Sequence, residues 1–111
     1  MQNLYDAFSQ IKSEKEFDAF LADLCTPSEV KNLRERWQIA QTLYTTNLSQ
    51  PTIAAKIGAS VTTVTRVARF LYSEKFGGYA AVLGRIFPAR AQKLAKDHPG
   101  RLTAASRIHH A

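Results

Sequence analysis

Residues 48–71, with the sequence LSQPTIAAKIGASVTTVTRVARFL, contain two short helical patterns joined at a glycine. Ser49 can cap the first helix, and Ile53 and Ile57 then recur at a spacing that places them on one side of it. Gly58 stands where a left-handed residue ends a helix at the lowest steric cost. The stretch therefore predicts a helix, a tight turn and a second helix.

The second helix of this stretch has two chemically different sides, and Ser60 can cap it. At about 100° per residue, one side gathers the apolar residues Val61, Val64, Val67, Ala68 and Leu71. The opposite side carries hydroxyl and guanidinium groups, from Thr62, Thr65, Arg66 and Arg69, with Thr63 at its edge. This pattern is typical of a helix-turn-helix motif, in which a buried elbow presents a polar, basic second helix to DNA.

A helical hairpin without any DNA-binding role could share the glycine and use arginine only for solubility. The exposed side carries threonine, however, where a merely solvated helix would more often carry the better helix formers Glu and Lys. Threonine and arginine can both bond phosphate oxygens or base edges. No acidic residue lies between Glu35 and Glu74, so nothing in this stretch would repel a polyanion.

Length and composition predict one all-α domain. The chain has 111 residues, 45% of them hydrophobic, with five Gly and four Pro and few alternating β-branched runs. The net charge of +6 is uneven: residues 1–30 carry −4, whereas residues 31–84 and 85–111 each carry +5. This polarity is expected if one end of the molecule faces nucleic acid. A ribosomal or anionic-membrane partner would favour a similar balance.

The remaining chemistry is sparse. Cys25 cannot form an internal disulfide, which suits a reducing cytoplasm. The N-terminus lacks a basic segment followed by an apolar run, so we expect neither secretion nor membrane insertion. His98, His109 and His110 lack the ligand spacing of a metal site. We expect no catalytic site, no metal and no cofactor.

Apolar stripes at helical spacing predict three helices within residues 3–46, the third about five turns long. The first two are short and strongly aromatic on one side, and such helices are marginal unless another surface covers them. The aromatic side chains either complete the core of a monomer or form the interface of a homodimer, and periodicity leaves both open. A helix-turn-helix role favours the dimer, which places two recognition helices about one duplex turn apart.

The pattern changes after the helix-turn-helix. Two glycines at 77–78 predict a turn, and a closing helix is expected at about 79–87. Residues 88–111 form a basic tail, in which a brief helix over 89–96 is possible and the rest is expected to be disordered. The tail could hold phosphates without reading sequence, or it could have no function.

Three passages resemble the Trp repressor superfamily, specifically the branch of uncharacterised regulators called YerC/YecD. They are LCTPSE at residues 24–29, the segments LSQ, IGAS and TVTR within residues 48–66, and GGY at residues 77–79. Together they extend over most of the chain before the tail, for which no counterpart is evident.

The resemblance implies an all-helical, intertwined homodimer. Its domain would be residues 1–87, with dimerisation helices in about 3–46, the helix-turn-helix at about 48–72 and the closing helix after it. It also places Thr62, Thr63 and Thr65 where the repressor meets operator DNA. The full set expected to bind DNA is Gln50, Ser60, Thr62, Thr63, Thr65, Arg66 and Arg69. Pro51 replaces a basic residue of the repressor, so a different operator or fewer backbone contacts are expected.

The resemblance further implies a pocket for tryptophan, the corepressor, held between two arginines and against a threonine. Arg36, Arg66 and Thr26 match those positions. Val67 replaces a glycine that leaves room for the indole, and Phe70 replaces a small serine. Because interiors have no spare volume, two larger side chains should clash with an indole. These five residues are therefore expected to form a vestigial effector pocket that does not bind tryptophan, with Phe70 as a built-in occupant.

The sequence thus predicts a sequence-specific, repressor-like transcriptional regulator of the bacterial cytoplasm and nucleoid, which binds double-stranded operator DNA as a homodimer. The alternative is a basic helical module that binds RNA or an acidic protein partner without operator specificity.

Overall fold

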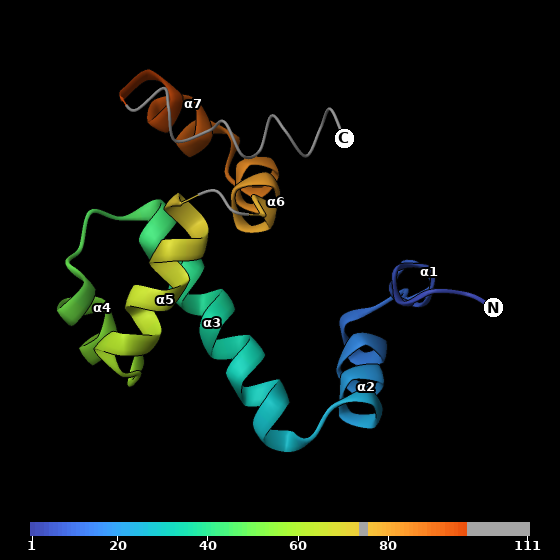
Figure 1. Cartoon of the computed structure of the whole chain (residues 1–111). Helices are drawn as coiled ribbons and strands as arrows, with labels where there is room; N and C mark the ends of the chain where they lie inside the picture. The colour runs from blue at the N-terminus through green and yellow to red at the C-terminus, as the bar shows by residue number, and fades with distance from the viewer. Residues whose placement is uncertain (74–75, 98–111) are drawn as a thin grey trace. The chain divides into compact units, whose positions relative to one another are not determined.

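The computed structural model describes residues 1–73 and 76–97, and every regular element in these ranges is an α-helix (Figure 1). The all-α prediction is confirmed. The chain divides into two compact units, Met1–Arg34 and Glu35–Ala111, and the second is described as far as Asp97. Within the described residues, no helix has the length and apolar character needed to span a membrane.

The first unit contains α1 (Leu4–Ser9), α2 (Glu14–Leu24) and the start of α3 (Pro27–Thr45). Polar side chains begin each helix: Asn3 and Asp6 form a reciprocal capping box on α1, and the Ser13 hydroxyl accepts the Glu16 N–H on α2 at 3.1 Å. These caps follow from local sequence spacing.

The aromatic stripes of α1 and α2 meet inside this unit. The ring of Phe8 packs against Phe17 and, edge to face, against Phe20, with centroids 6.3 and 5.7 Å apart. Nevertheless Leu21 is the only buried hydrophobic residue before α3. Tyr5 and Leu24 expose 78% and 51% of their surface. The unit therefore leaves much of its apolar surface uncovered.

A capping box also begins α3. The Glu29 carboxylate accepts the Thr26 N–H at 2.8 Å, and the Thr26 hydroxyl accepts the Glu29 N–H at 3.2 Å. The bond from the Thr26 backbone and, secondly, the contact with its hydroxyl hold the pKa of Glu29 below its usual value. The charged form is favoured in the folded state, so this contribution is present at neutral pH and is lost as the pH falls through the lowered pKa.

The second unit is built around the C-terminal half of α3. It adds α4 (Gln50–Ile57), α5 (Val61–Tyr72), α6 (Gly78–Ile86) and α7 (Pro88–Asp97). The largest fully buried side chains come from α3, α4, α5 and α6 and form one core: Ile39, Ile53, Val64, Val67 and Leu83.

The helix-turn-helix consists of α4 and α5. Ser49 and Ser60 cap them by accepting the N–H of the residue three positions later. Gly58 has a φ of 83° and donates its N–H to Ala54 O at 2.9 Å, which closes α4. No heavy atom would lie within 4 Å of an added Cβ, so the positive φ and not lack of space favours glycine.

One residue of the expected apolar side is placed differently. Val61 is 47% exposed, whereas Val64, Val67, Ala68 and Leu71 are buried as expected. Val61 is the first residue of α5 and precedes Val64, the first buried residue of that helix. Helical periodicity assigns a residue to a side of the helix, but it does not show how far along the helix the core extends.

The folded body continues beyond residue 87, where the sequence suggested that a tail begins. Helix α7 is longer than the brief helix considered for 89–96. The Arg90 side chain donates from Nε to Tyr44 O at 2.7 Å and from a terminal nitrogen to Asn47 Oδ1 at 3.2 Å. Leu94 packs against the core. The expected disordered end of the tail, with its three histidines, lies outside the described residues.

These contacts predict that α7 stabilises the second unit. Arg90→Ala should lower the free energy of unfolding by about 1–3 kcal/mol, because it removes hydrogen bonds from a charged group to the end of α3 and the loop after it. Lys93→Ala is the matched control, since Lys93 is exposed on the same helix. Urea unfolding followed by circular dichroism measures both. Equal midpoints for the two variants would contradict a structural role for Arg90.

Candidate nucleic-acid interface

The exposed side of α5 carries most of the residues expected to bind DNA. Thr62, Thr65, Arg66 and Arg69 are exposed, while the opposite side of the helix is buried. A groove of about 440 Å³ runs over this side, lined by Val61, Thr62, Thr65, Arg66, Arg69 and Phe70. The structure therefore gathers these four expected residues on one accessible surface, which we call the α5 face.

The hydroxyl groups of Ser60 and Thr63 already take part in the N-terminal cap of α5. The Ser60 hydroxyl accepts the Thr63 N–H at 3.0 Å, and the two hydroxyl oxygens are 2.9 Å apart. Thr63 is also only partly exposed. Both residues lie beside the α5 face, but their polar atoms already hold the cap together.

Gln50 and Thr65 form a link between the two helices that the sequence does not reveal. The Thr65 hydroxyl donates to Gln50 Oε1 at 2.7 Å, although 15 positions separate the residues. Both residues were expected to bind DNA. Gln50, at the start of α4, thereby lies beside the centre of the α5 face.

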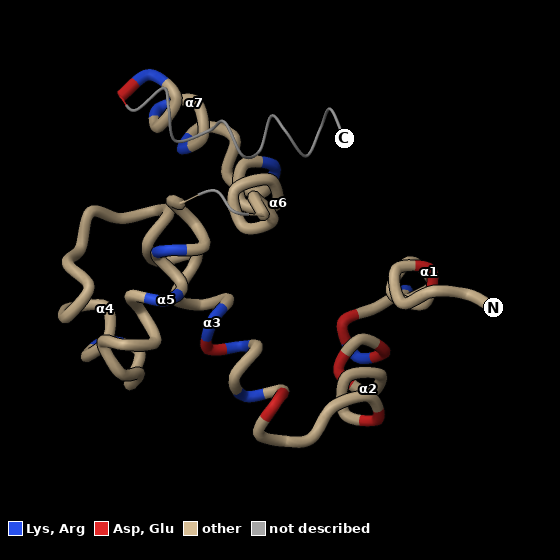
Figure 2. The backbone as a smooth tube through the Cα atoms, in the orientation of Figure 1, with Lys and Arg blue, Asp and Glu red and all other residues tan. Residues whose placement is uncertain are grey.

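The charged residues of α4 and α5 all have one sign. Figure 2 shows Lys or Arg and no acidic residue on α4 and α5, whereas Asp and Glu lie on α1, α2 and α3 and at the end of α7. The basic residues are Lys56, Arg66 and Arg69, and all three are exposed. A surface of this kind attracts a polyanion, and the attraction weakens with salt.

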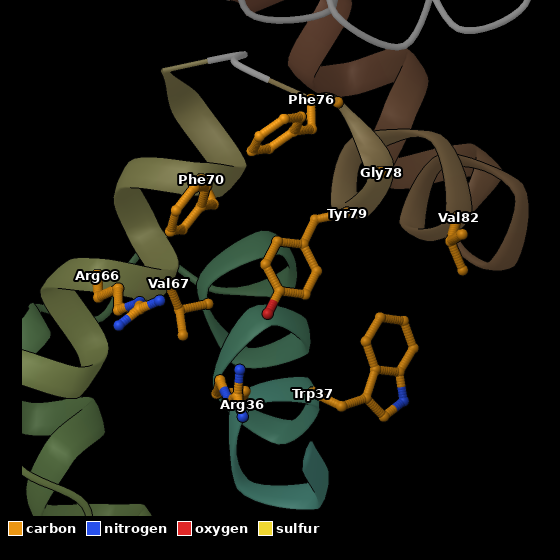
Figure 3. A pocket seen from close by; sticks show the side chains of 10 residues that line it. Arg36, Trp37, Arg66, Val67, Phe70, Phe76, Gly78, Tyr79 and Val82 are labelled. Atoms are coloured by element: carbon orange, nitrogen blue, oxygen red, sulfur yellow. The ribbon is translucent and has the colours of Figure 1, made fainter. Parts of the chain in front are cut away.

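Four residues of the expected effector pocket belong to the second unit and share one cavity. Arg36 from α3 and Arg66, Val67 and Phe70 from α5 line one cavity of about 590 Å³ (Figure 3). Thr26 belongs to the other unit, where it caps α3.

Phe70 lies on the wall of this cavity. Its ring stacks against Phe76, with centroids 6.2 Å apart and planes at 20°, and the Arg66 guanidinium carbon lies 5.8 Å from its centroid. Val67, which is 1% exposed, forms part of the same wall. Arg66 therefore lies at both sites, one side of it next to the α5 face and the other next to the cavity.

Sequence patterns did not reveal the other aromatic residues of the cavity. Trp37, Phe76 and Tyr79 line it together with Val82. Figure 3 shows Tyr79 extending from the start of α6 toward α3. The signal available in the sequence was the aromatic pair at Phe76 and Tyr79, on either side of the glycine turn. Within the described residues, no cluster of His, Cys, Asp and Glu could hold a metal ion.

Comparison with known proteins agrees with this geometry. The family model described as Trp repressor protein matches residues 1–86. The chain is also similar to a protein of Bacillus subtilis (strain 168) named "Uncharacterized protein YerC", with 32% identity over 71 residues, which are 64% of this chain and 67% of the relative. No solved structure gives a significant match. Trp repressor proteins are DNA-binding regulators and not enzymes, and helix α7 lies beyond the matched residues. The chain therefore belongs to the Trp repressor family.

Proposed function

We propose that this protein is a bacterial transcriptional regulator that binds a specific double-stranded operator as a homodimer, through α4 and α5, at the nucleoid in the cytoplasm. The observation that carries the proposal is the division of α5. Its buried side fixes the helix, and its exposed side presents hydroxyl and guanidinium groups, while α4 and α5 contain no acidic residue.

The exposed groups have the chemistry that duplex DNA requires. Arginine can bridge guanine O6 and N7 or bind phosphate, and threonine can bond a base edge or touch a thymine methyl. Arg69 lies toward the C-terminal end of α5, away from the N-terminal turn that usually enters the major groove. We therefore assign Arg69 to phosphate, and Thr62 and Thr65 to the bases.

A homodimer would cover the apolar surface of the first unit. Tyr5 and Leu24 lie on separate short helices that bury little by themselves. Intertwined N-terminal helices, as the family resemblance implies, would supply the missing contact area. Two-fold symmetry would also place the two α5 helices of the dimer about one duplex turn apart, so that they could enter adjacent turns of the major groove.

We further propose that tryptophan is not the effector. Val67 and Phe70 give the cavity a bulky wall, and Arg66 lies over the Phe70 ring instead of presenting both faces to a ligand. An indole carboxylate would have to displace that contact before the guanidinium could bind it.

The DNA proposal predicts separate effects for the threonines and arginines. After selection of a bound duplex from a random pool, Thr62→Ala should lower affinity for that duplex by about three- to tenfold at 150 mM salt, because a base hydrogen bond is lost. Affinity for random duplex should stay unchanged. Mobility-shift titration measures both, with Thr45→Ala as control, since Thr45 is exposed on α3 outside the motif.

Arg69→Ala should weaken specific and random duplexes equally and reduce the slope of log affinity against log salt by about one. Arg69→Lys keeps the charge and should restore most of the binding. If the protein prefers RNA, or selects no duplex sequence, the alternative of a basic interaction module replaces the proposed regulator.

The dimer predicts a change of mass when the first unit is altered. Light scattering after gel filtration should give twice the chain mass for the native protein. Leu24→Glu should give a monomer, because a buried charge in an apolar interface has no partner. Gln92→Glu, on the exposed side of α7, should leave the dimer intact. A native protein that is monomeric at micromolar concentration contradicts the proposal.

Calorimetry with millimolar tryptophan should detect no saturable heat for the native protein. Phe70→Ala should gain measurable affinity for indole compounds, because it widens the cavity and releases Arg66 from the ring. Ile86→Ala, on an exposed side chain outside the lining of the cavity, is the control. Clear saturable binding by the native protein would show that the larger side chains leave room for the corepressor.

A further inference from the structure

The hydroxyl groups of the α5 face differ in what they can still offer to DNA. A threonine hydroxyl has one proton to donate and two lone pairs that accept. The Thr65 proton points to Gln50 Oε1, with the oxygens 2.7 Å apart. Thr65 is exposed, so its oxygen remains open to a second partner, but only as an acceptor. In the part of the chain that the structure describes, the Thr62 hydroxyl has no such bond and keeps both capacities.

An acceptor without a proton selects among the groups of the major groove. Phosphate oxygens, guanine O6 and N7, and thymine O4 are all acceptors, so none of them can bond this oxygen. The exocyclic amino groups of adenine (N6) and cytosine (N4) are donors and can. Thr65 is therefore suited to adenine or cytosine.

Val61 bears on whether Thr65 is suited to adenine or to cytosine. It lies one helical turn before Thr65 on the same groove, and it is 47% exposed. Side chains four apart on a helix have Cβ atoms about 5–6 Å from each other, close enough to touch one base pair. An adenine–thymine pair shows the adenine amino group and the thymine methyl in the major groove, whereas a guanine–cytosine pair has no methyl group there. An apolar side chain beside an acceptor thus matches adenine–thymine.

We propose that Gln50 sets the base preference of Thr65 by accepting the hydrogen bond that its hydroxyl donates, and that Thr65 and Val61 together read an adenine–thymine pair. The inference rests on the proposed function and names part of the operator it would recognise. Gln50 is a positioning residue in this respect. Its amide nitrogen keeps two protons, which suit a neighbouring phosphate oxygen.

The test begins with the whole 111-residue chain and a pool of random duplexes. The native protein should select a site with adenine–thymine at one position of each half-site. At that position, purine in place of adenine removes only the N6 amino group, and uracil in place of thymine removes only the methyl. The first change should lower native affinity by about three- to tenfold, and the second by about three- to fourfold.

Variants of the protein show which residue is responsible for each loss of affinity. Thr65→Val should bind the adenine and purine duplexes equally, while Thr65→Ser should recover the preference for adenine. Val61→Ala should bind the thymine and uracil duplexes equally. The carboxylate of Gln50→Glu can only accept hydrogen bonds, so this variant should keep the adenine preference despite weaker overall binding. Gln50→Ala releases the Thr65 hydroxyl and should relax that preference about threefold or more.

These outcomes separate the inference from the function on which it rests. A native protein that selects a site, but whose Thr65→Val and Gln50→Ala variants discriminate adenine from purine as the native protein does, overturns the inference and leaves the regulator standing. A native protein that selects no site overturns both. Matching circular dichroism spectra of all variants show that any loss of discrimination is not a loss of fold.

Discussion

The burial of one side of α5 decides which of its side chains can touch another molecule. Val64 and Val67 are almost fully buried in the core that α3, α4 and α6 share, and each such side chain contributes about 1.5–3 kcal/mol when it leaves water. Rotation of the helix about its axis would expose both and drive guanidinium groups into an apolar interior without partners. The core therefore permits one orientation, and that orientation presents the α5 face.

The turn between α4 and α5 and the caps of these helices make the helix-turn-helix a rigid motif. Gly58 adopts the left-handed conformation that lets α4 end and α5 begin within a few residues. The hydroxyl groups of Ser60 and Thr63 cap the start of α5, so these residues contribute more to the structure of the helix than to contacts with DNA bases. Gln50 and Thr65 then join the two helices at the surface. Threonines that look equivalent in the sequence thus acquire different chemical roles.

The sequence predicted those features that depend on neighbours along the chain. Ser49, Gly58 and Ser60 act within four residues, and the apolar repeat of α5 is read directly as a buried side. The exposure of Val61 could not be predicted, because it depends on how far the core extends along α5, and residues distant in the sequence determine that extent. The Gln50–Thr65 and Arg90–Tyr44 bonds join residues 15 and 46 positions apart, and no local pattern marks them. The roles considered for Arg36 and Arg66 in the cavity came from family resemblance, since spacing alone does not bring α3 and α5 to one pocket.

The attachment of α7 has a consequence for the order in which the molecule is completed during translation. Arg90 follows Asn47 by 43 positions, so the whole helix-turn-helix is synthesised before Arg90, the residue whose side chain binds the loop leading into that motif. Until then the carbonyl of Tyr44 lacks its guanidinium partner. The nascent motif therefore has its own helices early but reaches its final stability late, and a chain that ends before Arg90 would contain a helix-turn-helix whose entry loop lacks these hydrogen bonds.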